Sequence, residues 1–164
     1  MITDKFIREM EEIVGKTHVS VSRANAELYS YDASLARGKP GVVVFPADSR
    51  ETAQLVRAAH REGIPFVPRG FGTNLSGGTI VTVEGLVVCL SRLNRILGIY
   101  PEGRYAVAQP GVTNLELQEA LAPIGIFYAP DPASQKVATL GGNAGENSGG
   151  PRCLKYGVTT NHVL

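Results

Sequence analysis

Glycine is concentrated in two short windows, residues 70–78 and 141–150, which hold nine of the 19 glycines in the chain. Glycine lets the backbone approach a ligand closely and adopt positive φ angles. A glycine-rich turn after a strand can present successive backbone N–H groups to phosphate oxygens. Both windows lie between stretches of ordinary globular sequence, so they indicate loops that approach a ligand, whereas evenly spread glycine would indicate disorder.

The first window fits two phosphate-binding motifs only in part. A dinucleotide fingerprint, GxGxxG, must open a helix. Gly70 and Gly72 fit it, but Leu75 takes the third glycine position, and strand-like residues 79–83 follow. A Walker A loop needs a lysine where this chain has Gly78. Both motifs are therefore disfavoured.

A nucleophile elbow, GxSxG, is also excluded. Ser76 follows Asn74, and Ser148 follows Glu146, so neither serine has the required glycine two places before it. What remains is a loop that wraps a diphosphate without lysine, magnesium or a following helix. Arg69 either adds charge at the mouth of this loop or is an ordinary solvated arginine.

The second window supplies another stretch of close backbone. The amides of Asn143 and Asn147 could hydrogen-bond the polar edge of a ring. The simpler interpretations are a hairpin loop for the first window and a flexible linker for the second. Asp131, between two prolines, could be only a turn residue.

The elements before the first window are predicted from periodicity. Residues 4–14 and 22–29 are expected to be helices, and the apolar run 42–45 is expected to be a buried strand. A helix over 48–62 and a strand over 64–68 follow.

This strand–helix–strand order predicts a βαβ unit with parallel strands. Asp48 is the expected N-cap of the helix, with Glu51 as its reciprocal partner, and Gly63 ends it. Pro65 and Pro68 place the second strand at a sheet edge.

Three strands are predicted after the first window, over residues 86–90, 96–100 and 105–108, with a hairpin turn at 102–103. Thr113 and Glu116 form a capping box for a helix that ends near residue 121. The order of elements indicates an α+β fold.

Composition excludes several classes of protein. The chain has 164 residues, about one domain, and a formal net charge of +1, without the basic stripe of a nucleic-acid binder. No apolar run approaches a transmembrane length, and no signal pattern opens the chain, so we expect a cytoplasmic protein without a transmembrane segment. Two distant cysteines and three scattered histidines show no metal spacing, so no metal site is predicted.

Several motifs, in order, resemble the PCMH-type FAD-binding fold, also called the vanillyl-alcohol oxidase fold. Residues 68–78 resemble its pyrophosphate loop, and residues 109–112 resemble its turn beside the flavin ring. Residues 130–143 resemble its second flavin-contacting stretch. Residues 146–157 are most similar to the glycolate oxidase and D-lactate dehydrogenase branch.

The resemblance implies a PCMH-type α+β fold with a small parallel βαβ subdomain and a second, mixed or antiparallel sheet. It also implies an N-terminal helical segment, residues 1–40, before the FAD-binding domain, residues 41–164. FAD would be held non-covalently, because the first loop lacks the histidine to which some relatives attach flavin. The cofactor-binding residues would be Arg69, Gly70, Phe71, Gly72, Thr73, Asn74, Leu75, Ser76, Gln109, Pro110, Gly111, Pro130, Asp131, Ser134, Thr139, Gly141, Gly142, Asn143, Asn147, Ser148, Gly149, Tyr156 and Gly157.

Members of this family continue for hundreds of residues past the motif at residues 156–157, into a cap domain that carries the substrate base. The expectation is therefore the FAD-binding portion of an enzyme that oxidises a 2-hydroxy acid, such as glycolate or D-lactate, by hydride transfer to flavin. No catalytic residue is predicted, and this portion alone is expected to be inactive. Subunits of a glycolate-oxidase-like complex are possible partners. The alternatives are a non-catalytic nucleotide-binding or interaction subunit and, third, an alcohol or sugar oxidase of the same fold.

Overall fold

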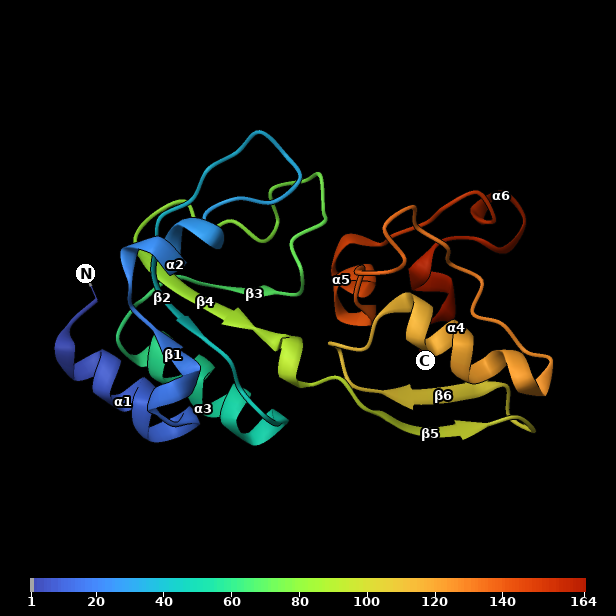
Figure 1. Cartoon of the computed structure of the whole chain (residues 1–164), viewed down its shortest axis with the longest axis horizontal. Coiled ribbons are helices and arrows are strands. Elements are labelled where there is room, and N and C mark those ends of the chain that lie inside the picture. The colour runs from blue at the N-terminus through green and yellow to red at the C-terminus, as the bar shows by residue number, and fades with distance from the viewer. Residues whose placement is uncertain (1) are drawn as a thin grey trace. The chain divides into compact units, whose positions relative to one another are not determined.

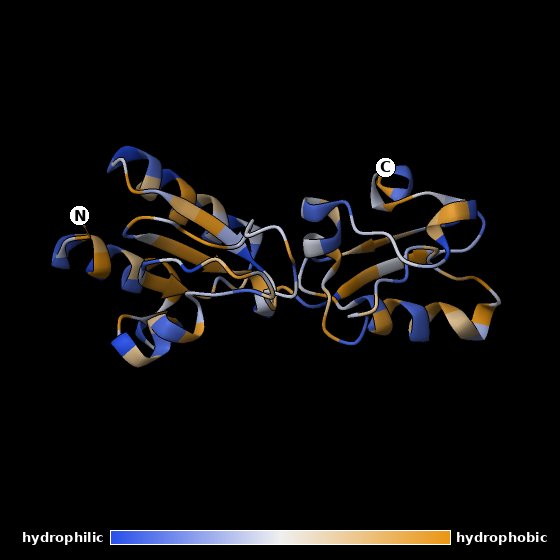
Figure 2. Ribbon diagram, turned by 90° about the horizontal axis from the view of Figure 1, so that it is seen from above, coloured by the Kyte–Doolittle hydropathy of each residue, from blue (hydrophilic) through white to orange (hydrophobic). Residues whose placement is uncertain are grey.

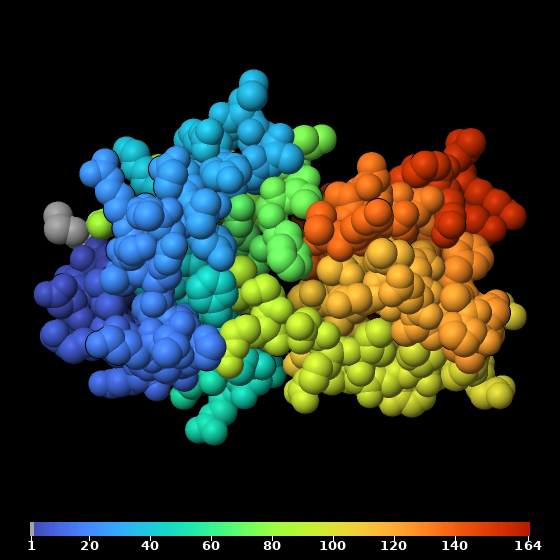
Figure 3. Space-filling view, in the orientation of Figure 1, coloured from blue at the N-terminus to red at the C-terminus, as the bar shows by residue number. Residues whose placement is uncertain are grey.

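The computed structural model describes residues 2–164 and divides the chain into two compact units, one up to Arg92 and one from Leu93 to Leu164 (Figure 1). Figure 3 shows the surface of the first unit in blue to green and of the second in yellow to red. The predicted boundary at 40/41 stays a prediction, because a compact packing unit and a family domain need not share their limits.

The first unit is built on a four-stranded sheet. Its strands are β1 (Val19–Ser20), β2 (Pro40–Val44), β3 (Phe66–Arg69) and β4 (Gly85–Cys89), in the spatial order β1-β2-β4-β3. β1 runs antiparallel to β2, and β2 and β3 both run parallel to β4. All of β4 is buried, as expected for a central strand of a parallel sheet.

Helices α1 (Asp4–Val14) and α3 (Ser49–Arg61) pack together beneath one face of this sheet. Side chains alternate between the two faces of a strand, so β2 and β4 contribute to two cores. One core joins Val42 and Val44 to the helices, and the other joins Val43 to Tyr29 and Phe45. Figure 2 shows the apolar residues along the strands and on the inner sides of the helices.

The two strands of the predicted βαβ unit run parallel, as expected, but they are not neighbours in the sheet. β2 and β3 are parallel to each other, yet β4 lies between them. β3 is an edge strand, as Pro65 and Pro68 predicted, because proline cannot donate a ladder hydrogen bond. Short helix α2 (Arg23–Leu28) is confirmed, with Ser22 as its N-cap. The short 3-10 helices Lys16–His18 and Leu90–Arg92 complete this unit.

The helix caps were largely predictable. Asp48 caps α3 by accepting from the backbone N–H of Glu51. The expected reciprocal bond differs, because the carboxylate of Glu51 accepts from the N–H of Ala47 instead of Asp48. The capping box of Thr113 and Glu116 on α4 (Asn114–Leu121) is confirmed in both directions.

The second unit contains the predicted antiparallel hairpin, β5 (Ile96–Tyr100) and β6 (Tyr105–Ala108). Helix α4 packs on it through Leu117 and Leu121, which form a core with Val112. The remaining elements are α5 (Leu140–Glu146), α6 (Cys153–Tyr156) and the 3-10 helices Ala122–Ile124 and Thr159–His162.

Two local expectations are corrected. Residues 79–83 form no strand, although they also form no helix, so the argument against a dinucleotide fingerprint stands. The second glycine window is not an open loop at its start, because residues 140–146 form α5. The reason is the cap: the side chain of Thr139 accepts from the N–H of Gly142. The α+β class is confirmed, with one mainly parallel sheet and one antiparallel sheet.

Candidate functional site

The first glycine window forms an irregular loop that leaves the end of β3. Gly72 and Gly77 have φ angles of +69° and +77°, which L-residues rarely adopt. Within residues 2–164, the backbone N–H groups of Phe71, Gly72, Thr73 and Leu75 have no hydrogen-bond acceptor. A run of free N–H groups in a glycine loop is the donor set that suits phosphate oxygens.

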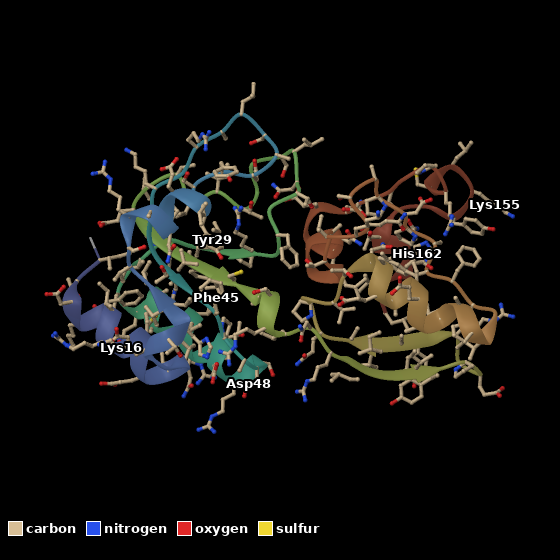
Figure 4. The ribbon with its side chains drawn as sticks, viewed as in Figure 1. Lys16, Tyr29, Phe45, Asp48, Lys155 and His162 are labelled. Atoms are coloured by element: carbon tan, nitrogen blue, oxygen red, sulfur yellow. The ribbon has the colours of Figure 1, made fainter. Side chains whose placement is uncertain are left out.

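Arg69, which starts this loop, points into the protein. It is 5% exposed, and its guanidinium donates to the carbonyl of Tyr31 at 2.7 Å and to Oγ1 of Thr79 at 3.3 Å. It also lies 5.5 Å from the ring of Tyr29, which is labelled in Figure 4. The predicted solvated position is therefore wrong, and the predicted contribution of its charge to the loop stays a prediction. Its inward partners are a carbonyl and a ring from a distant segment, which local sequence does not reveal.

The pKa of Arg69 is lowered by burial, and the nearby Cys89 and Asp32 oppose this shift. An arginine stays protonated in proteins even so. A Cβ on Gly72 would lie 2.2 Å from Nη2 of Arg69. The glycine is therefore required both by its φ angle and by the guanidinium packed against it.

Asp32 was not predicted as a site residue. It is 7% exposed, and its carboxylate accepts from the N–H of Ser34 at 2.7 Å and from Nδ2 of Asn74 at 2.6 Å. Burial raises the pKa of Asp32, but these hydrogen bonds and the charge of Arg69 lower it by more, so the net pKa lies below its usual value. The Asp-x-Ser spacing is typical of a local Asx turn and could have marked this residue.

In the second unit, two predicted stretches meet at the start of α5. The N–H of Gly141 donates to the carbonyl of Pro110, and that of Leu140 donates to the carbonyl of Val112, both at 2.8 Å. A Cβ on Gly141 would lie 2.6 Å from Cβ of Pro110. Gly111 is itself anchored through its N–H to the carbonyl of Leu93 at 2.7 Å. The close approach of Gly141 to Pro110 leaves no room for a side chain at position 141.

Two amide side chains are buried in the same unit, one on α5 and one on α4. Asn143 is 1% exposed, and its Nδ2 has no hydrogen-bond partner among the described residues; the same holds for Oδ1 of the fully buried Asn114. Such unsatisfied atoms mark places where water or a bound group completes the hydrogen bonding. The side chain of Gln109, in contrast, already accepts from the N–H of Arg95.

Other predicted residues are engaged within the chain. The carboxylate of Asp131 accepts from the backbone N–H and from Nε of Arg152. Oδ1 of Asn147 accepts from the N–H and the hydroxyl of Thr160, and the carbonyl of Ser148 accepts from the hydroxyl of Thr159. These side chains hold the segment after α5 in place.

The remaining predicted residues fall in the same two groups. In the first unit, Oγ of Ser76 accepts from the N–H of Gly78. In the second unit, the backbone carbonyl of Pro130 accepts a hydrogen bond from Nδ2 of Asn114. The exposed ring of Tyr156 packs edge-on against Phe127. The others in the second unit are Ser134, Thr139, Gly142, Gly149 and Gly157, of which Gly157 has a φ angle of +82°.

The second unit also has an apolar concavity of about 980 Å³. It is lined by residues of β5, β6 and α4, by residues 126–129 and 161–164, and by Leu140, Gly141, Ala144, Tyr156 and Thr159. Several of its aromatic and aliphatic side chains are exposed, among them Tyr105, Val107 and Phe127.

No helix of residues 2–164 has the length and apolarity to cross a membrane. The same residues hold no group of three or more histidine, cysteine, aspartate or glutamate side chains placed to bind a metal ion.

Sequence comparison places the chain beside flavin enzymes. A family model described as FAD binding domain matches residues 40–164. The glycolate oxidase subunit GlcD of Bacillus subtilis (strain 168) is 41% identical over 100% of the chain and 35% of that protein. The D-lactate dehydrogenase of Anaerostipes hadrus is 34% identical over 99% of the chain and 34% of that protein. The chain spans about a third of the length of these relatives.

Solved structures agree on the fold. Alkyldihydroxyacetonephosphate synthase matches with a TM-score of 0.85 at 24% identity, over 96% of this chain and 32% of that one. The 4-ethylphenol oxidase from Gulosibacter chungangensis matches with a TM-score of 0.73 at 31% identity, over 85% of this chain and 28% of that one.

Proposed function

The chain belongs to the family of FAD binding domains, and from that premise we propose how it holds the cofactor. The loop of residues 70–78 binds the diphosphate through the free backbone N–H groups of residues 71–73 and 75. The Pro110–Gly141 contact and Asn143 form part of the surface that receives the flavin ring. The first loop contains no histidine, so FAD is held non-covalently.

The observation that carries this proposal is the set of N–H groups at residues 71–73 and 75, which lack an acceptor within the described chain. The loop has no lysine, so phosphate recognition falls to the backbone. The unpartnered Nδ2 of Asn143 is a second donor that a bound group or water would satisfy.

For the whole protein we propose oxidation of a 2-hydroxy acid of the glycolate or D-lactate type. The support is the similarity to glycolate oxidase subunit GlcD and to D-lactate dehydrogenase. Bound FAD would supply the hydride acceptor for such a reaction, and the protein would supply position and electrostatics. A cytoplasmic location, and assembly with further subunits of a glycolate-oxidase-like complex, belong to the same proposal. No residue of the described chain is proposed as the base.

The test is an absorbance spectrum of the purified chain after incubation with FAD and desalting. We expect flavin bands that co-elute with the protein and survive an excess of NAD. Denaturation should release all the flavin, because no covalent bond holds it. A folded chain that stays colourless would contradict the cofactor proposal for this chain. Bound FAD with no 2-hydroxy-acid oxidation by the full-length protein would favour the alternative, a non-catalytic nucleotide-binding subunit.

A further inference from the structure

A buried polar cluster joins residues 31–34 to the first glycine loop. Its charged members, Asp32 and Arg69, are 7% and 5% exposed. These residues come from segments almost forty positions apart in sequence, and the carbonyl of Tyr31 accepts from Arg69. The segment 31–34 precedes the residues 40–164 that the family model matches.

Asn74, in the middle of the loop, is held by this segment through both its side chain and its backbone. Its Nδ2 donates to Asp32 at 2.6 Å, and its carbonyl accepts from the N–H of Ala33 at 3.1 Å. Its Oδ1 accepts from the hydroxyl of Thr79 at 3.0 Å. The side chain of Asn74 is therefore used inside the protein to fix the loop.

The two ends of the loop are tied to the same cluster. Arg69 at the start donates to Oγ1 of Thr79 at the end, at 3.3 Å. The start, middle and end of the loop thus share one hydrogen-bonded network, and the N–H groups of residues 71–73 are left outside it.

We propose that residues 31–34 are an integral part of the diphosphate site and that Asp32 is a positioning residue, which acts on the loop through Asn74. This inference rests on the proposed binding of FAD. Asp32 makes no contact with the ligand; it holds the backbone so that the free N–H groups face one anion. Arg69 balances its charge, because an uncompensated carboxylate close to a diphosphate would repel it.

The experiment is a double-mutant cycle on the 164-residue chain with Asp32→Ala, Asn74→Ala and the double variant. Dissociation constants are measured for FAD and for ADP, which keeps the diphosphate and lacks the flavin ring. Glu12→Gln, on the exposed side of α1, is the matched control for removing one carboxylate from the same unit. Circular dichroism at the binding temperature confirms that each variant is folded. If Asp32→Ala fails to fold, Asp32→Asn replaces it, because it keeps the acceptor for Ser34 and removes the acceptor for Asn74.

We expect each single substitution to weaken the binding of FAD and of ADP by the same factor, about tenfold. The double variant should bind both ligands no more weakly than either single variant. Glu12→Gln should bind both ligands like the wild type. Additive losses, or a loss for FAD without a loss for ADP, would overturn the role of Asp32 through Asn74. Unchanged binding in Asp32→Ala would overturn it while leaving the FAD proposal intact. A wild-type chain that binds neither ligand would overturn both.

Discussion

At the scale of single residues, the glycines of the first loop are required by geometry. Gly72 combines a φ angle of +69° with a guanidinium packed where its Cβ would stand. Left-handed backbone costs an L-residue roughly 1–2 kcal/mol, and the displaced Arg69 would lose its two hydrogen bonds.

We therefore predict that Gly72→Ala weakens FAD binding by at least about tenfold and lowers the unfolding temperature. Gly145→Ala is the control, because a Cβ there meets no atom within 4 Å. Flavin fluorescence titration and thermal unfolding measure the two effects. Equal affinities for the two variants would show that the loop does not need its left-handed glycine.

Asp32 makes stability depend on pH. Its pKa in the folded protein lies below the unfolded value of about 3.9. A group with a lowered folded pKa stabilises the protein fully above the unfolded pKa, and this contribution is lost as the pH falls through the folded pKa.

Urea unfolding of the wild type and of Asp32→Asn should therefore differ most near about pH 7, and the difference should shrink below about pH 4. Glu12→Gln controls for the loss of one surface carboxylate. A difference in unfolding free energy that stays constant down to about pH 3 would contradict a role for the ionised carboxylate.

At the scale of elements, the start of α5 is placed by its contact with the turn at Pro110. Thr139 caps the helix and pairs with Thr113, the cap of α4, in an isolated bridge. The two helices thus begin side by side, and Gly141 lies against Pro110.

We predict that Gly141→Ala weakens FAD binding and leaves ADP binding unchanged. The added Cβ would push α5 away from Pro110, in the unit proposed to receive the ring, while the diphosphate loop lies in the other unit. Gly145→Ala on the same helix is the matched control. Equal losses for FAD and ADP would show instead that the substitution acts on the diphosphate site or on folding as a whole.

At the scale of the molecule, the second unit exposes several large apolar side chains around its concavity. Tyr105, Val107 and Phe127 line its concavity and are each more than 40% exposed. Its two-stranded sheet also has unpaired edges, which favour pairing with another chain.

The chain is therefore expected to self-associate at high concentration, with a light-scattering mass above 17.4 kDa. Val107→Lys should lower that mass, because it places a charge in the concavity. Val83→Lys, at a similarly exposed position in the first unit, should not. A concentration-independent monomer for the wild type would refute this prediction.

Local sequence was enough to determine the features that depend only on residues a few positions apart in the chain. The limits of α1, α3 and α4, the caps at Asp48 and Thr113, and the edge position of β3 follow from periodicity, capping side chains and proline. The motifs also indicated the FAD-binding family, which the family match confirms. The individual ligand contacts stay predictions.

Tertiary structure decided what depends on distant partners. It placed β4 between β2 and β3, because a central strand must be buried on both faces. It turned Arg69 inward onto the carbonyl of Tyr31 and brought Asp32 to Asn74. Those hydrogen bonds join residues about forty positions apart, and no local pattern encodes a pairing that exists only once the sheet has formed.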